Sequence, residues 1–315
     1  MLRSSRIALL IALAATSVYA ATGAPVHRTF NVAPGGTLTI DADVGDIEVT
    51  SASGNTVTVD VTQSAHSNRY MDVTAEQQQN DVIVRGKFED TSRWFRWSNV
   101  DAKFVVSVPS RYNVQLGTSG GDIRVADLQG QARVKTSGGG IKLGSIDGPV
   151  TAHTSGGDIS ITGSRGEVEL HTSGGGIDIG NVAGNIRAKT SGGSVEVKHA
   201  GGDLYIRSSG GGIEIGEANG TVDAETSGGS IRARLAAQPR SDSRLSTSGG
   251  GITVSIAPNV SVDVDAHTSG GDVETDVPVT LLGRQNESAI EGKINGGGPK
   301  LMLRSSGGDI RIRKL

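Results

Sequence analysis

The chain has 315 residues, of which 30 are basic and 33 acidic, giving a formal net charge of −3 at pH 7. This mildly acidic balance argues against general affinity for nucleic acid or anionic lipid. The sequence contains no cysteine, which excludes disulfides and a lipid-modified cysteine anchor. Stability must therefore come from packing and hydrogen bonding.

The beginning of the chain has the pattern of a secretory signal peptide. Arg3 and Arg6 precede an apolar run, residues 7–15, and a small-residue cleavage site ends at Ala20. The apolar run is too short to span a bilayer well, and no later stretch has spanning length. We therefore predict that residues 1–20 are removed. The mature protein is expected in the periplasm, on the cell surface or outside the cell.

Residues 27–116 are predicted to form an N-terminal β region. Short stretches with period-two alternation are separated by turn residues, which is typical of β-strands. These stretches are residues 37–40, 47–50, 57–61, 82–84 and 104–108. Most aromatic residues of the chain lie in this region, so we expect it to cap one end of the fold that follows.

From residue 117 to residue 315 the chain is a repeat. Ser-Gly-Gly begins every eighteen residues at Ser119, Ser137, Ser155, Ser173, Ser191, Ser209 and Ser227, and less regularly at Ser248, Ser269 and Ser306. A second glycine recurs between the triplets, and short alternating stretches lie between the glycines. Two strands and two turns per repeat predict one coil of a parallel β-solenoid. We expect one glycine of each triplet to adopt a positive φ.

Alternation along the strands predicts the core face. Three residues before each triplet, large and small side chains alternate, as in Ala152, Leu170, Ala188 and Ile206. Such alternation fills a narrow core. It also fits a spatial repeat of 36 residues, so the sequence leaves both coil lengths open, together with the handedness and the oligomeric state. The threonine before each triplet is expected to be structural, and Lys314 is expected near the end of the stack opposite the cap.

These motifs resemble those of a known bacterial family. Repeated Thr-Ser-Gly-Gly-Asp-Ile units, the early Val44-Gly45-Asp46-Ile47, Val108-Pro109 and the final Gly-Gly-Asp-Ile strand are similar to the DUF4097-type putative-adhesin family. The resemblance spans residues 29–315. It implies a β-solenoid exported to the cell envelope, without established enzymatic activity or agreed ligand.

A column of basic side chains is the first candidate site. The residue before each turn threonine is Lys135, His153, His171, Lys189 and Arg207 in five successive repeats. On a solenoid these side chains would stack on one outer face, where they could bind acidic polysaccharide or lipid head groups. The sequence alone favours an ordinary solvated face over such a site. A metal shared by His153 and His171 would lack the further ligands that such a site needs.

The segment Arg93, Trp94, Phe95, Arg96, Trp97 is the second candidate. Aromatic rings beside arginines can stack on sugars or lie at a membrane interface, and they can equally cover the first coil. The Gly-Gly-Asp units suggest calcium, but Asp is present in only some repeats and the ligand number is too small. We expect no cofactor and no metal.

Taken together, the sequence favours an exported, non-enzymatic β-solenoid that acts as an adhesin or interacts with the cell envelope. Its expected partners are an envelope glycan or another envelope protein, and nucleic acid is not expected. The alternative is a polysaccharide-active β-helix enzyme, a lyase or hydrolase, for which the consecutive carboxylates Asp178, Glu196 and Glu214 are the nearest candidates. A purely structural periplasmic module is the third hypothesis.

Overall fold

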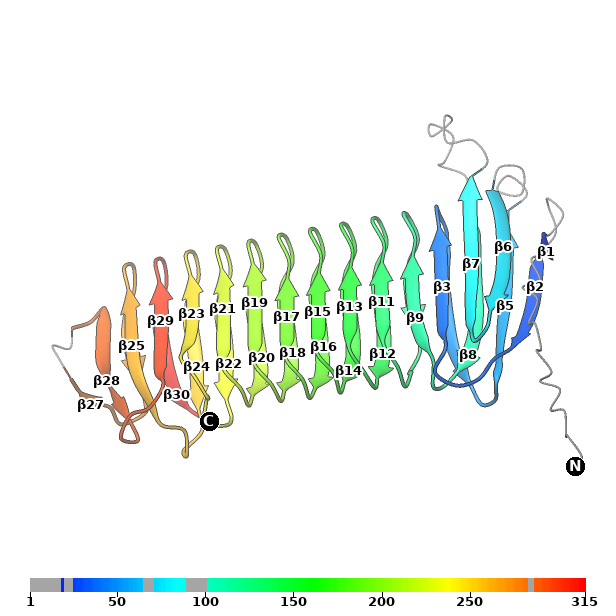
Figure 1. Cartoon of the computed structure of the whole chain (residues 1–315). Coiled ribbons are helices and arrows are strands. Elements are labelled where there is room, and N and C mark those ends of the chain that lie inside the picture. The colour runs from blue at the N-terminus through cyan, green and yellow to red at the C-terminus, as the bar shows by residue number, and fades with distance from the viewer. Residues whose placement is uncertain (1–17, 20–24, 65–70, 89–100, 283–285) are drawn as a thin grey trace, which may run out of the picture.

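The computed structural model describes residues 18–19, 25–64, 71–88, 101–282 and 286–315. Every regular element in these ranges is a β-strand, so they contain no helix that could cross a membrane. The strands form two long sheets of 16 and 14 strands, here called sheet A and sheet B. Both sheets run along an elongated stack of coils (Figure 1). The predicted all-β solenoid is confirmed.

In the central stack each coil gives one strand to each sheet. The strands of sheet A are β9 (Asn113–Gly117), β11 (Ala132–Lys135), β13 (Val150–His153), β15 (Val168–His171), β17 (Ile186–Lys189), β19 (Leu204–Ser208), β21 (Val222–Thr226) and β23 (Ser243–Thr247). Those of sheet B are β10 (Ile123–Val125), β12 (Ile141–Ile146), β14 (Ile159–Ser164), β16 (Ile177–Val182), β18 (Val195–Ala200), β20 (Ile213–Ala218), β22 (Ile231–Leu235) and β24 (Ile252–Ile256). Neighbours pair in parallel, and Val150 lies opposite Val168, which lies opposite Ile186. The spatial repeat is therefore one coil of 18 residues, and the 36-residue alternative is wrong.

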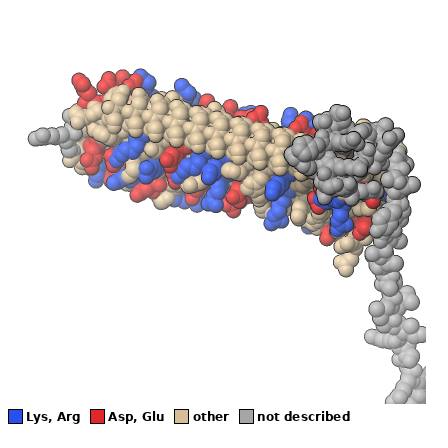
Figure 2. Space-filling view, turned by 90° about the horizontal axis from the view of Figure 1, so that it is seen from above, with Lys and Arg blue, Asp and Glu red and all other residues tan. Residues whose placement is uncertain are grey.

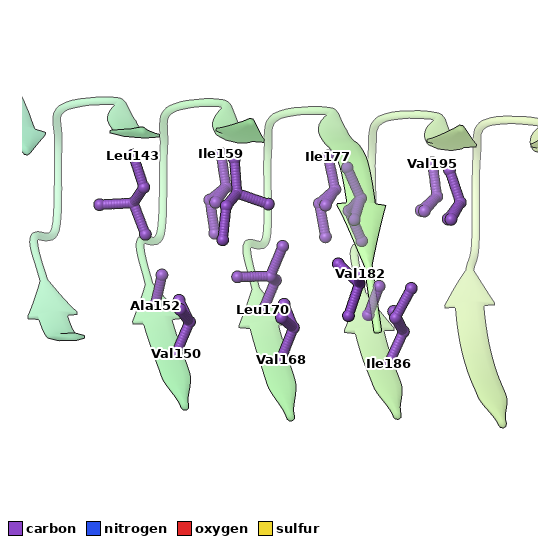
Figure 3. Packing of buried hydrophobic residues seen from close by; sticks show 14 of the residues in the cluster. Leu143, Val150, Ala152, Ile159, Val168, Leu170, Ile177, Val182, Ile186 and Val195 are labelled. Carbon is purple, nitrogen blue, oxygen red and sulfur yellow. The ribbon is translucent and has the colours of Figure 1, made fainter. Parts of the chain in front are cut away.

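The core lies between the two sheets. Because successive side chains of a strand point to opposite faces, apolar residues fill the inside and polar residues cover the outside. Figure 3 shows Leu143 and Ile159 of sheet B packed towards Ala152 and Leu170 of sheet A. Ala188, the next small residue of the alternating column, has no exposed surface. The predicted core face and its alternation of large and small residues are confirmed.

The buried threonines beside the turns are structural, as expected. Thr154 Oγ1 donates a 2.7 Å hydrogen bond to the Gly139 carbonyl of the preceding coil, and Thr172 Oγ1 donates a 2.8 Å bond to Gly157. The same bond recurs along the stack. Each hydroxyl thus satisfies a turn carbonyl that would otherwise lie near the core without a partner.

The Ser-Gly-Gly turns require glycine for a reason that the sequence did not reveal. No triplet glycine has a positive φ. In the described ranges, the glycines with positive φ are Gly35, Gly45, Gly54, Gly296 and Gly297. Successive turns instead stack so closely that a Cβ on Gly175 would overlap the carbonyl of Gly157. The expected left-handed conformation is therefore wrong, and clearance between coils is the physical requirement.

The N-terminal strands both extend the stack and cover its end. They are β1 (Val18–Tyr19), β2 (Val26–Asn31), β3 (Thr37–Ala42), β4 (Asp46–Ala52), β5 (Thr56–Gln63), β6 (Met71–Gln78), β7 (Asp81–Phe88) and β8 (Ala102–Pro109). β3 and β4 pair in parallel with β9 and β10, and β7 and β8 stack outside them as a further coil. β2, β5 and β6 add antiparallel strands at this end, and β1 pairs with β6.

The C-terminal strands depart from sequence order. They are β25 (Val262–Thr268), β26 (Val273–Thr275), β27 (Thr280–Leu281), β28 (Ala289–Ile294), β29 (Lys300–Ser305) and β30 (Ile310–Lys314). β29 lies between β23 and β25, and β30 lies between β24 and β26 (Figure 1). The last coil is thus inserted into the stack. The expectation that Lys314 blunts the far end is wrong, because β26, β27 and β28 occupy that end.

Candidate functional site

The five predicted basic residues stand in register on the outer face of sheet A. We call Lys135, His153, His171, Lys189 and Arg207 the basic column. Each is the direct cross-strand partner of the next, so their backbones are about 4.8 Å apart. The imidazole rings of His153 and His171 have centroids 5.9 Å apart. The period-two strand pattern is what turns all five side chains outward.

Charge compensation differs along the basic column. Arg207, at one end, donates a 2.8 Å hydrogen bond to Asp223 Oδ2 and lies 3.4 Å from Glu225 Oε2. Lys135 and Lys189, in contrast, form no ion pair within the part of the chain that the structure describes. Lys135, at the other end of the column, and Lys189 therefore carry positive charge that the described part of the protein does not neutralise.

The adjacent outward column reinforces this charge. Arg133 on β11 and Arg187 on β17 also form no ion pair among the residues described. Glu169 is the single acidic side chain on the outer face of strands β11, β13, β15 and β17. Four fixed cations thus surround one carboxylate and two histidines. Such a surface attracts anions, most strongly at low ionic strength.

His171 is a titratable group near the centre of the basic column. Burial lowers the pKa of His171, and the charges of His153 and Lys189 lower it further, while Glu169 opposes them. His171 is therefore mainly uncharged at neutral pH. Acidification adds positive charge between the two lysines.

A shallow groove lies at the N-terminal end of the basic column. Gly117 occupies the column position between Asp41 and Lys135, and it lines a hollow of about 510 Å³. The groove is also lined by Arg85 and His153. It gives the cationic surface a concave end into which a ligand chain can fit.

The acidic residues of the enzyme hypothesis lie on the opposite sheet. Asp178, Glu196 and Glu214 are direct cross-strand partners on the outer face of sheet B. The first two line a groove of about 530 Å³ together with Lys142 and Lys198. The structure thus brings the three carboxylates together in one exposed column, as the sequence indicated.

The Asp residues that follow Gly-Gly have a structural use. Asp158 Oδ1 accepts a 2.7 Å hydrogen bond from the amide of Gly176 in the next coil, and Asp122 Oδ1 accepts a 2.9 Å bond from Gly140. Each of these bonds ties one coil to the next. Within the described ranges, no group of three His, Cys, Asp or Glu residues is placed to hold a metal ion.

Three other features bear on possible binding sites. Figure 2 shows the molecule from above, on the side of the Ser-Gly-Gly turns. An uncharged ridge follows the stack of turns, and charged side chains of both signs lie on its two flanks. The second candidate of the sequence, Arg93, Trp94, Arg96 and Trp97, lies outside the described residues. Tyr205, which the sequence analysis did not assign to a site, is 40% exposed beside Arg207 on sheet A.

Comparison with solved structures finds chains of similar length at low sequence identity. A "putative cell adhesion protein" from Clostridium sporogenes is 10% identical with a TM-score of 0.25, and the match covers 93% of this chain and 100% of that chain. A "putative adhesin" from Bacteroides fragilis is 11% identical with a TM-score of 0.36, covering 93% and 98%. A "putative lipid binding protein" from Parabacteroides distasonis is 13% identical with a TM-score of 0.33, covering 91% and 97%.

Comparison with protein families gives a direct assignment. No curated protein matches the sequence. The family model described as Toastrack DUF4097 matches residues 36–203 and 202–313, which together make up most of the chain. The repeat, the two-sheet solenoid and the family match agree with one another, and the chain belongs to the Toastrack DUF4097 family.

Proposed function

We propose that this protein is an exported, non-enzymatic adhesin of the cell envelope that binds an anionic polysaccharide along the outer face of sheet A. The observation that carries the proposal is the uncompensated charge of two lysines in the basic column. Lys135 and Lys189 lack ion-pair partners in the described ranges, whereas Arg207 is paired with Asp223 and Glu225. The resemblance of the first 20 residues to a signal peptide supports export.

A linear polyanion suits this surface better than a compact anion. The fixed positive charges lie on β11 and β17, three strand spacings of about 4.8 Å apart, and the two histidines lie between them on β13 and β15. A chain that lies along the solenoid axis can contact several of them at once. Many weak contacts along one chain then add up to useful affinity.

Binding of defined polymers tests the proposal. Dextran sulfate and polygalacturonate supply anionic chains, and dextran supplies the uncharged backbone as a matched control. We expect the purified full chain to bind both anionic polymers, more weakly as salt increases, and not to bind dextran. No binding to either anionic polymer at low salt would contradict the proposal.

The same samples distinguish binding from turnover. A polysaccharide lyase or hydrolase would release unsaturated or reducing ends from polygalacturonate, and the triple variant Asp178→Asn, Glu196→Gln, Glu214→Gln would not. We expect the wild-type protein to release neither kind of end. Turnover that the triple variant abolishes would establish the enzyme alternative instead.

The export part of the proposal is tested by locating the N-terminus of the mature protein. Intact-mass analysis of the protein recovered from a bacterial envelope fraction should give an N-terminus near Ala21. A cytoplasmic protein that retains residues 1–20 would contradict the export part of the proposal.

A further inference from the structure

We propose that a second groove, beside Tyr205, is a binding site for one unit of an uncharged saccharide. Tyr205 projects from β19 on the outer face of sheet A and is the only exposed Phe, Tyr or Trp in the described ranges. A groove of about 230 Å³ adjoins it. The proposal does not depend on anion binding, because Lys135 and Lys189 do not line this groove.

The Tyr205 ring is held in place from within the protein. The guanidinium carbon of Arg207 lies 4.0 Å from the ring centroid, and that of Arg187 lies 5.6 Å away. Arg207 is itself fixed by a 3.0 Å hydrogen bond to the Asp223 carbonyl and a 2.8 Å bond to the Asp223 carboxylate. A fixed ring binds a ligand with little loss of conformational entropy. The part of Tyr205 that stays exposed, 40% of the residue, is therefore a fixed contact surface.

Polar side chains along the groove are also fixed and keep unused hydrogen-bonding atoms. Asn185 Oδ1 accepts a 2.9 Å bond from the Asp203 amide, and Asp203 Oδ1 accepts a 2.8 Å bond from the Thr221 amide. The Asn185 side-chain nitrogen and Asp203 Oδ2 have no hydrogen-bond partner in the part of the chain described. The groove thus offers both donors and acceptors at defined positions.

Asp223 adds an acceptor that the fold leaves unsatisfied. Its Oδ1 atom is buried and, among the described residues, accepts no hydrogen bond, while Oδ2 is bound by Arg207. A buried carboxylate oxygen without a partner costs free energy. Asp223 also lines the groove, where a ligand hydroxyl could donate to its carboxylate.

The chemistry of the groove selects a neutral sugar. A pyranose ring presents C–H groups on one face, which pack on an aromatic ring, and hydroxyls around its rim, which bond to carboxylates and amides. Asp223 is paired with Arg207, and the remaining carboxylates, Glu167 and Asp203, outnumber the one cation that lines the groove, Arg187, so the groove does not favour an anionic ligand. The metal alternative fails, since these carboxylates form no group able to hold an ion.

The test uses uncharged oligosaccharides and calorimetry on the full chain. The probes are cellohexaose, maltohexaose, mannohexaose and N-acetylchitohexaose, each up to about 10 mM, because a single sugar subsite gives dissociation constants of about 0.1–1 mM. We expect at least one probe to bind. Tyr205→Ala should weaken that binding at least about tenfold, whereas Tyr205→Phe, which keeps the ring, should change it less than about threefold.

Controls separate this site from the basic column and from misfolding. The Lys135→Ala, Lys189→Ala double variant should bind the sugar as the wild type does, while Tyr205→Ala should still bind dextran sulfate, which also shows that it is folded. Asp223→Asn should weaken sugar binding. If no probe binds, or if Tyr205→Ala binds as tightly as wild type, the proposal is overturned whatever the outcome with dextran sulfate.

Discussion

Arg304 and Asp265 join two coils that are adjacent in space but out of order in sequence. An Arg304 side-chain nitrogen donates a 2.6 Å hydrogen bond to Asp265 Oδ2, 39 residues earlier in the chain. This bond and the charge of Arg304 keep the pKa of Asp265 below its usual range. The pair links β29 of the inserted coil to β25, which stacks outside it.

The inserted coil should carry much of the stability of its end of the stack. Leu303 on β29 is fully buried and pairs with Leu245 and Ala266 on the two flanking strands. We expect Leu303→Ala to lower the free energy of unfolding by about 2–5 kcal/mol, because it removes buried apolar contacts and leaves a cavity. The matched control Leu281→Ala, on β27 at the surface, should change it by less than about 0.5 kcal/mol. Equal urea midpoints for the two variants would contradict the inserted position.

The turn glycines should be intolerant of a single methyl group. Gly175→Ala places a Cβ against the carbonyl of Gly157 in the preceding coil, and relieving that overlap requires the coils to separate. We expect a loss of about 1–3 kcal/mol in the free energy of unfolding by urea titration. Ser173→Ala in the same turn is exposed and should be nearly neutral. A neutral Gly175→Ala would show that coil spacing does not impose this requirement.

The alternation of large and small core residues should behave as a packing rule. Ala188 lies between Leu170 and Ile206 in its column and has no exposed surface. Ala188→Leu should destabilise the protein by about 1–3 kcal/mol through overpacking. Combining it with Ile206→Ala restores the total side-chain volume. The double variant should therefore lose less free energy of unfolding than the sum of the losses of the two single variants. A loss larger than that sum would contradict the packing rule.

How far the sequence predicts this fold can be seen from these same residues. The eighteen-residue period predicts a stack of parallel strands, and period-two alternation predicts its core face, because both follow from strand geometry alone. The alternation around Ala188 left coils of 18 and 36 residues open, and the strand pairing decides for 18. The insertion of β29 could not be predicted. Its Ser306-Gly307-Gly308-Asp309 turn fits the repeat at any level of the stack, so a local pattern does not fix the order of coils.

The candidate site also has features that the sequence predicts and features that it does not. Period two is enough to place Lys135 and Lys189 on one outer face. The pairing of Arg207 with Asp223 could not be predicted, because it depends on side-chain conformation across neighbouring strands. Glycine in the Ser-Gly-Gly turns has two possible physical causes, positive φ or close approach of backbones, and composition does not distinguish them.

Anion binding should strengthen as the pH falls. Burial, His153 and Lys189 lower the pKa of His171 from its ordinary value of 6.5, so the free protein gains this charge only below that pH. A bound polyanion favours the protonated form. Affinity for dextran sulfate, measured by calorimetry between about pH 8 and about pH 5.5, should therefore rise on acidification with uptake of protons.

The lowered pKa of His171 also affects the stability of the free protein, which decreases on acidification, whereas affinity for the polyanion increases. His171 contributes to stability above the unfolded-state pKa, and this contribution is lost as the pH falls through the lower folded-state value.

The double variant His153→Gln, His171→Gln tests the role of the histidines in binding. In this variant the pH dependence of polymer binding should largely disappear. Unchanged pH dependence in that variant would show that the histidines are not part of the binding surface.

The most direct test of the account compares charge reversal on the two sheets. Lys135→Glu, Lys189→Glu reverses the basic column on sheet A, and Lys142→Glu, Lys198→Glu makes the same net change on the outer face of sheet B. The quantity measured is the dissociation constant for dextran sulfate at fixed pH and low salt. We predict that the sheet A variant binds at least about a hundredfold more weakly than wild type, and that the sheet B variant stays within about fivefold. Equal losses in both variants would mean that only net charge matters, and would contradict a binding surface on sheet A.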